Sequence, residues 1–167
     1  MFKNLGLDLS RNVLRLMVLS DDDSTYFAKT GEVFKPINAK NFLTQEDVTS
    51  ANLKGKYVFI DFLGTWCKGY VEQLPHLKGI YENVNKDHIE FLGIASMDDP
   101  KRLAHFLKNR SLDWRQILSD STNDMVAANS VTSFPSNFLI GPNGRILQRD
   151  ISISELEKVL ASLGCMK

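Results

Sequence analysis

The chain has 167 residues, with 20 basic and 20 acidic side chains and a formal net charge of zero. Its hydrophobic fraction is 43% and its charged fraction 24%, values that are ordinary for a globular protein with one core. No basic run is longer than the pair Lys101-Arg102, and no apolar run approaches the roughly 20 residues that cross a bilayer. We therefore expect neither a nucleic-acid partner nor an integral membrane segment.

The beginning of the chain has the least regular pattern. Residues 13–19 and 25–34 are candidate strands around an acidic turn, so we predict an N-terminal extension over residues 1–30 that could be a β-hairpin. Arg15 interrupts the first apolar stretch and no small-residue cleavage site follows it, so this stretch is not a convincing signal peptide. Residues 36–50 are polar and are expected to form a long connection.

The central part of the chain alternates strand and helix patterns. Residues 57–63 are almost continuously apolar, which predicts a strand buried on both faces. A helix is expected from about Cys67, because Leu74 begins a run of apolar residues at helical spacing, and Pro75 should kink it. Residues 89–95 predict a second buried strand.

The last third of the chain contains clear start and stop signals. Asp99-Pro100 is a typical helix start, and residues 121–129 are expected to form a shorter helix. Strands over residues 136–140 and 145–150 should pair as a hairpin across a Gly-Pro-Asn-Gly turn. Ser152 and Glu155 are spaced as a capping box for a final helix.

From residue 57 onward the order is therefore β-α-β-α-(α)-β-β-α. The first two strands need a crossover and should be parallel, whereas the hairpin strands should be antiparallel. This order predicts an α/β fold, with a mixed central sheet and helices on both of its faces.

The strongest chemical signal is the turn Gly64-Thr65-Trp66-Cys67 between the first buried strand and its helix. A thiol at a helix N-terminus faces unpaired backbone N–H groups and the positive end of the helix dipole. Both favour the thiolate, which is the reactive form of cysteine. Cys67 is therefore a candidate nucleophile.

This turn, the dipeptide Phe134-Pro135 before the hairpin and the order of elements resemble the thioredoxin superfamily. Within it, the chain is most similar to thiol-disulfide oxidoreductases of the TlpA/ResA type, which are grouped with the AhpC/TSA proteins. The resemblance covers roughly residues 31–163 and implies a thioredoxin-like domain over residues 31–167. It also implies a periplasmic or other extracytoplasmic location, and protein or small-molecule thiols and disulfides as partners.

One position departs from this family pattern. The family motif is Trp-Cys-x-x-Cys, and Tyr70 holds the place of the second, resolving cysteine. A phenol cannot release a mixed disulfide by thiolate attack, so the resolving position is lost. Asp61 matches the buried carboxylate that moves protons in thioredoxins, and is a candidate catalytic residue with a raised pKa. Gln73 holds the place of a helix glutamate, with Glu72 one position away and expected in solvent.

The remaining site residues also follow from the resemblance. Pro135 matches the cis-proline that faces the active-site cysteine and leaves a backbone edge free for substrate, with Phe134 beside it. Trp66 is either a partly exposed lid over Cys67 or a core aromatic residue. Cys165 follows the last helix and is expected to be a free surface thiol, or to make an intermolecular contact, rather than to pair with Cys67.

Three functions remain open on these residues. The first is a thiol-disulfide oxidoreductase homologue restricted to monothiol chemistry at Cys67, and the second is a catalytically degenerate thioredoxin-fold binding module. The third is a one-cysteine peroxidase, although Gly64 and Ile60 stand where peroxidatic sites carry threonine and proline. The histidines are dispersed and no Gly-rich phosphate loop occurs, so no metal site and no cofactor is expected.

Overall fold

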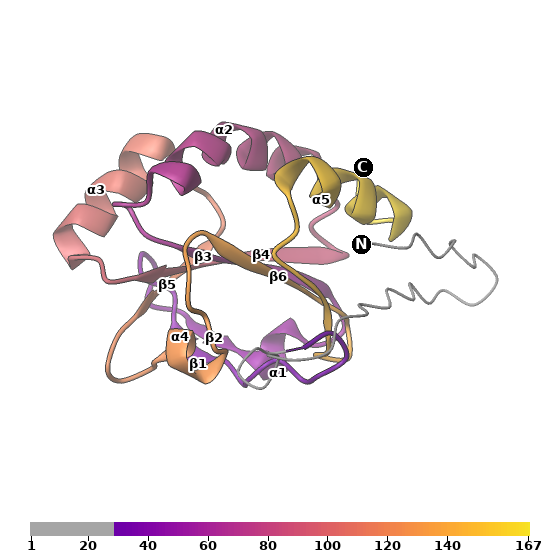
Figure 1. Ribbon diagram of the computed structural model, residues 1–167, viewed down its shortest axis with the longest axis horizontal. Coiled ribbons are helices and arrows are strands. Elements are labelled where there is room, and N and C mark those ends of the chain that lie inside the picture. The colour runs from indigo at the N-terminus through magenta and orange to yellow at the C-terminus, as the bar shows by residue number, and fades with distance from the viewer. Residues whose placement is uncertain (1–28) are drawn as a thin grey trace.

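The computed structural model describes residues 29–167 and has three layers (Figure 1). A five-stranded sheet in the order β5-β4-β3-β6-β7 forms the middle layer. One face is covered by α2, α3 and α5, and the other by α1, α4 and the β1–β2 hairpin. The helices are α1 (Ser50–Leu53), α2 (Lys68–Asn83), α3 (Pro100–Arg110), α4 (Met125–Ala128) and α5 (Ile153–Ser162). The strands are β1 (Asn38–Lys40), β2 (Asp47–Thr49), β3 (Tyr57–Leu63), β4 (Ile89–Ser96), β5 (Arg115–Ser119), β6 (Ser136–Ile140) and β7 (Ile146–Arg149).

The predicted mixed sheet with helices on both faces is confirmed. β3 pairs with β4 in parallel and with β6 in antiparallel fashion, so it is the central strand. Its residues are buried from Val58 to Leu63, as the continuous apolar run predicts. Both β3 and β6 have the bounds expected from the sequence.

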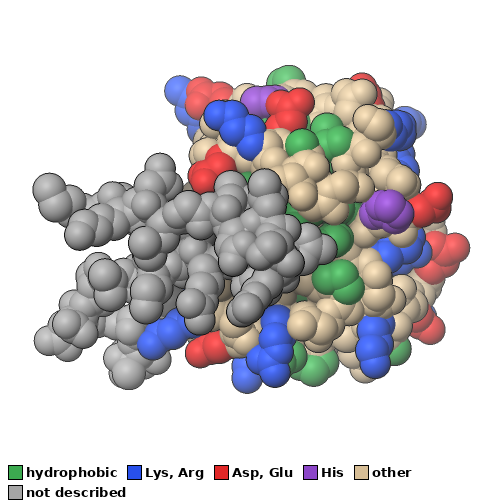
Figure 2. Space-filling model, turned by 90° about the vertical axis from the view of Figure 1, so that its right-hand side faces the viewer, with side chains coloured by type: hydrophobic (Ala, Val, Ile, Leu, Met, Phe, Trp, Pro, Cys, Tyr) green, Lys and Arg blue, Asp and Glu red, His purple; other side chains and the backbone are tan. Residues whose placement is uncertain are grey.

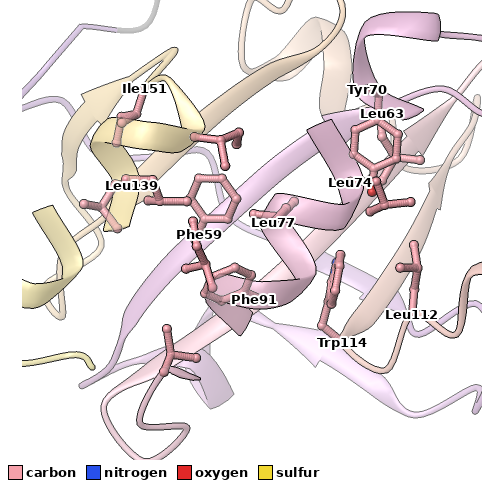
Figure 3. Close-up of a cluster of buried hydrophobic side chains, with 14 of the residues drawn as sticks. Phe59, Leu63, Tyr70, Leu74, Leu77, Phe91, Leu112, Trp114, Leu139 and Ile151 are labelled. Carbon is pink, nitrogen blue, oxygen red and sulfur yellow. The ribbon is translucent and has the colours of Figure 1, made fainter. Parts of the chain in front are cut away.

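The core is divided by the sheet into two clusters, and the larger one lies beneath α2 (Figure 3). Alternate residues of β3 point to opposite faces: Phe59 packs toward α2, whereas Ile60 packs toward the hairpin side. Figure 3 shows Tyr70, Leu74 and Leu77 of α2 lying over the sheet. Buried side chains along α2 therefore anchor this helix to the sheet.

The ends of two helices follow the sequence signals. The Asp99 side chain accepts hydrogen bonds from the backbone N–H groups of Lys101 and Arg102 at the start of α3, and proline is the first helical residue. Ser152 accepts from the N–H of Glu155 at the start of α5. The helix α2 continues through its internal proline as one element.

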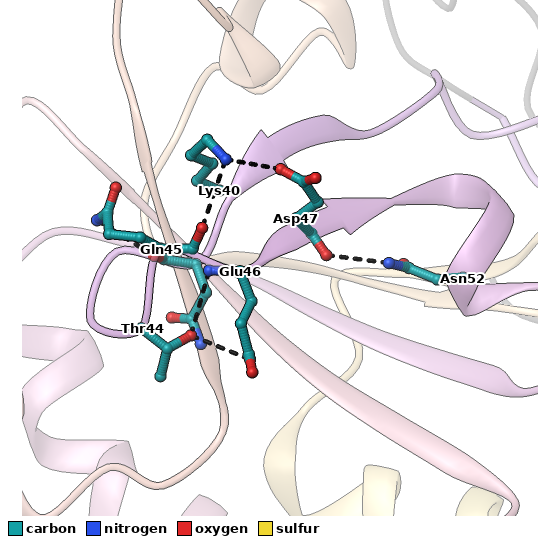
Figure 4. A network of polar contacts seen from close by, with 7 residues as sticks. Lys40, Thr44, Gln45, Glu46, Asp47 and Asn52 are labelled. Carbon is teal, nitrogen blue, oxygen red and sulfur yellow. Dashed lines mark hydrogen bonds and ion pairs between the residues drawn. The ribbon is translucent and has the colours of Figure 1, made fainter.

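The connection expected over residues 36–50 is in fact a short hairpin followed by α1 (Figure 4). Lys40 Nζ donates to Asp47 Oδ1 at 2.8 Å and to the carbonyl of Gln45 at 3.4 Å. The Asn52 side chain donates to the carbonyl of Asp47 at 3.0 Å and ties α1 to β2. Strands of three residues are too short to show the alternation by which strands are recognised.

Other expectations need correction. The strand β5 is absent from the predicted elements, because only five residues with mixed polarity form it. The helix expected over residues 121–129 is limited to α4, since Asp124 caps it and Asn129 ends it. Within residues 25–34 the described part is a turn with one bridge from Val33 to Arg145. The candidate strand over residues 13–19 and most of the predicted extension over residues 1–30 lie outside the described residues.

Charged side chains of both signs are interspersed over the face shown in Figure 2, in keeping with the zero net charge. Among residues 29–167, no helix combines the length and the apolar character that a membrane span requires.

Candidate functional site

The candidate site is built around Cys67, which lies between β3 and α2. Cys67 is the N-cap residue of α2, and its side chain makes no capping hydrogen bond. Its backbone N–H donates to the carbonyl of Gly64 at 2.9 Å, and its own carbonyl accepts from Val71 at 3.2 Å. The thiol therefore lies at the positive end of a 16-residue helix, and 8% of the residue is exposed.

Two aromatic residues and a proline lie near the start of α2. The Phe134–Pro135 peptide bond is cis. A Cβ atom built on Gly69 would lie 3.6 Å from Cδ of Pro135, so the proline packs against the first turn of α2. The rings of Trp66 and Phe134 meet edge to face, with their centroids 5.5 Å apart. Residues from two distant segments of the chain thus meet at the start of α2.

Trp66 is 43% exposed, so it is a partly exposed residue beside Cys67 and not a core residue. Its indole Nε1 donates to the carbonyl of Ser96 at 3.2 Å. The ring folds back over Gly64, where a Cβ atom would lie 2.4 Å from the indole. Glycine is therefore required at position 64 for this placement of the ring.

Asp98 holds the turn before Cys67, a role that no sequence motif indicates. One carboxylate oxygen accepts from the backbone N–H of Thr65 at 2.8 Å, and the other accepts from the Thr65 hydroxyl. These bonds join residues 33 positions apart, so no local pattern could reveal them. These hydrogen bonds hold the turn before Cys67 against the loop that follows β4.

Asp61 and Tyr70 lie buried beneath the same turn. Burial raises the pKa of the Asp61 carboxyl from 3.8 to about 7. Burial also raises the pKa of the Tyr70 phenol well above 10.0, and the nearby Asp61 charge adds to this. Lys56, just before β3, donates to the carbonyl of Lys86 at 2.9 Å. The Asp61 Oδ2 and Tyr70 hydroxyl oxygens have no hydrogen-bond partner among the described residues.

Cys165 is buried, so the prediction that it is a surface thiol is wrong. Its carbonyl accepts from the N–H of Asn85 just beyond the end of α2. The length of α2, about 24 Å at 1.5 Å per residue, separates it from Cys67, and this is too far for a disulfide. Burial raises the pKa of the Cys165 thiol.

The polar residues that follow Tyr70 lie at the surface of α2. Gln73, which holds the place of the helix glutamate, is exposed, and so is Glu72. Glu72 Oε1 lies 3.6 Å from Lys68 Nζ, one turn earlier in the helix. The expected solvent position of Glu72 is therefore confirmed, and its partner is a surface lysine.

Comparisons with known proteins show the family and the fold. Residues 30–149 match the model of the AhpC/TSA family. The thiol-disulfide oxidoreductase ResA of Bacillus subtilis is 25% identical over 126 residues, which cover 73% of this chain and 70% of that protein.

Two solved structures show the same fold. The thioredoxin domain of a thiol-disulfide oxidoreductase from Bacteroides vulgatus aligns with a TM-score of 0.74 at 21% identity, over 81% of this chain and 97% of that chain. A thiol-disulfide oxidoreductase from Bacteroides fragilis aligns with a TM-score of 0.69 at 24% identity, over 79% of this chain and 99% of that chain. The fold is therefore thioredoxin-like, as the sequence predicts.

Proposed function

Because the chain belongs to the AhpC/TSA family and has a thioredoxin-like fold, we propose that it is a thiol-disulfide oxidoreductase homologue restricted to monothiol chemistry at Cys67. One observation carries the proposal: Cys67 is the N-cap residue of α2, Pro135 packs against the first turn of that helix, and the residue one turn after Cys67 is Tyr70. A dithiol enzyme would need a second cysteine at that position, and a buried phenol cannot replace it.

The proposed reaction is thiol-disulfide exchange in two steps. The Cys67 thiolate attacks one sulfur of a substrate disulfide, so a new S–S bond forms while the other substrate sulfur leaves as a thiolate and takes a proton. An external thiol, acting as its thiolate, then attacks the substrate sulfur of the mixed disulfide. This step joins the external thiol to the substrate sulfur and releases Cys67 as a thiolate. Protein or small-molecule thiols and disulfides are the proposed partners.

The neighbouring residues have proposed roles in the same reaction. Trp66, Phe134 and Pro135 would bind the substrate, since they form a partly exposed aromatic rim beside the thiol. Asp61 would exchange a proton beneath the site, because its pKa of about 7 allows both charge states near neutral pH. Tyr70 would keep its proton and take no part in this exchange, since the pKa of its phenol is raised well above 10.0.

A binding module without redox activity is the second candidate. It is favoured by the low exposure of Cys67, 8%, next to the well-exposed Trp66. In this case the aromatic rim would hold an extended peptide and the thiol would be structural. A one-cysteine peroxidase has less support, because Gly64 precedes Cys67 at the place of the peroxidatic threonine and the Thr65 hydroxyl is bound to Asp98.

We further propose that residues 31–167 form the thioredoxin-like domain and residues 1–30 an extension. This division is supported by a family match that begins at residue 30. The resemblance to TlpA/ResA-type proteins supports an extracytoplasmic location.

Alkylation of the two cysteines tests whether Cys67 is a live nucleophile. At neutral pH, brief treatment with iodoacetamide should label Cys67 at least about ten times faster than Cys165, because rate follows thiolate fraction and access. Peptide mass mapping gives both rates, and urea-unfolded protein is the control in which they should become similar. Equal labelling in the folded protein, or preference for Cys165, would favour the binding module.

A further inference from the structure

A row of four residues in register crosses the sheet beneath α2. Gly93 of β4 pairs with Asp61 of β3 on one side and with Gln116 of β5 on the other, and Asp61 also pairs with Asn137 of β6. Residues in register on neighbouring strands point to the same face of a sheet. Asp61 lies two positions after Phe59, so the row shares the face of Phe59, which is the face covered by α2.

The glycine in this row makes room for the Gln116 side chain. Gln116 is fully buried. A Cβ atom built on Gly93 would lie 2.1 Å from Oε1 and 2.8 Å from Nε2 of Gln116, so the amide group lies over Gly93. Since neighbouring strands are about 4.8 Å apart, this position brings the amide next to the Asp61 side chain.

Several polar atoms in this row and in the helix above it have no partner. Asp61 Oδ2, the Tyr70 hydroxyl and both amide atoms of Gln116 are buried and have no hydrogen-bond partner in the described part of the chain. Asn137, on the other side of Asp61, differs because its side chain bonds the backbone N–H and carbonyl of Ile151 at 2.9 and 3.0 Å. Buried polar groups are nearly always satisfied by the protein or by an ordered water molecule.

We propose that Gln116, Asp61 and Tyr70 share one bound water molecule beneath the Cys67 turn, with Gln116 as a positioning residue for Asp61. The Tyr70 hydroxyl and Gln116 Nε2 donate to the water oxygen, and the water donates to Asp61 Oδ2, which gives the three hydrogen bonds that buried waters typically make. Tyr70 from α2 is the titratable group that faces Asp61, while β5 and β6 contribute the neutral amides of Gln116 and Asn137.

This site goes beyond the proposed exchange reaction, because it exists whether or not Cys67 is reactive. In this site the water molecule links Asp61 to the phenol of Tyr70. A dithiol protein would have its second thiol at position 70. A hydrogen bond donated to the ionised carboxylate favours that form. Gln116 and Tyr70 therefore both lower the pKa of Asp61 from the value that burial alone would impose.

A double-mutant cycle on the Asp61 pKa tests the shared water. Tyr70→Phe and Gln116→Met each remove one donor and keep most of the side-chain volume. In the full chain labelled with ¹³C at aspartate carboxyls, each variant should raise the pKa of Asp61 by about one pH unit. The double variant should raise it no further than the larger single change, because either substitution already releases the water. Leu118→Met, on the same face of β5, is the control for repacking and should leave the titration unchanged.

Several outcomes would overturn the proposal. Shifts that add in the double variant would mean that the two groups act on Asp61 separately. An unchanged titration in either single variant, or an equal shift in Leu118→Met, would remove Gln116 or Tyr70 from the cluster. If Gln116→Met does not fold, NMR of the unsubstituted protein still tests for the bound water. A long-lived water should show a rotating-frame Overhauser contact to the Tyr70 ring protons, and its absence would contradict the shared site.

Discussion

Replacing Asp61 by asparagine should remove a large pH-dependent part of the stability of this protein. In the unfolded chain this carboxyl ionises near 3.8, whereas burial keeps it protonated in the folded protein up to about pH 7. Between these values the folded state binds more protons, so the free energy of unfolding falls as the pH rises. The contribution is fully present below the unfolded pKa and is lost by about pH 7, a difference of roughly 4 kcal/mol at most.

Urea unfolding at pH 4, 6 and 8 measures this difference. The unsubstituted protein should lose stability over this range, and Asp61→Asn should lose up to roughly 4 kcal/mol less. At pH 8 the variant should be the more stable protein, because no charge is buried. Asp87→Asn removes an exposed carboxylate and controls for the change in net charge. Identical pH dependence in the Asp61 variant and the unsubstituted protein would mean that Asp61 is not buried as a titrating group.

The second large effect is expected at Tyr70. The unsubstituted protein should have little activity in a disulfide-reduction assay that needs a complete dithiol cycle. Position 70 is one helical turn from Cys67, so a thiol there can reach the Cys67 sulfur. Tyr70→Cys should form a reducible disulfide with Cys67 and raise turnover at least about ten-fold, because resolution becomes intramolecular.

Tyr70→Ser is the matched control, because it loses the same buried ring without gaining a thiol. Both variants should lose about 2–4 kcal/mol of stability through the cavity that the ring leaves. Only Tyr70→Cys should gain turnover and a disulfide that mass spectrometry detects under oxidising conditions. If no disulfide forms, Tyr70 does not occupy the resolving position. If the unsubstituted protein already turns over at a comparable rate, another group releases Cys67.

Much of the fold could be predicted because its strongest elements carry local signals. The continuous apolar run defines β3, the Gly-Pro-Asn-Gly turn defines the β6–β7 hairpin, and Asp99 with Pro100 marks the start of α3. The strand β5 and the β1–β2 hairpin could not be predicted in this way. They are short, and tertiary contacts rather than periodicity hold them: the N–H of Phe42, just after β1, donates to the carbonyl of Gln116 at 2.6 Å.

The candidate site could likewise be predicted only in part. Cys67, Trp66 and Pro135 belong to motifs that are visible in the sequence, and the structure places Trp66 against Phe134 and Pro135 against the first turn of α2. Asp98 and Gln116 carry no local signal, because Asp98 bonds Thr65, 33 positions away, and Gln116 lies beside Gly93 of the neighbouring strand. For Cys165 the position near the C-terminus suggests exposure, whereas the contact of its backbone with the end of α2 buries it.

The most direct test of monothiol chemistry is the fate of a mixed disulfide at Cys67. Reduced protein is treated with oxidised glutathione, excess reagent is removed, and the adduct is followed by peptide mass mapping. A Cys165→Ser variant is run in parallel, so that only Cys67 can react. We expect a Cys67 adduct that persists without added thiol and disappears at a rate proportional to the concentration of an external thiol. No adduct at Cys67, or its release without any external thiol, would contradict monothiol chemistry at this residue.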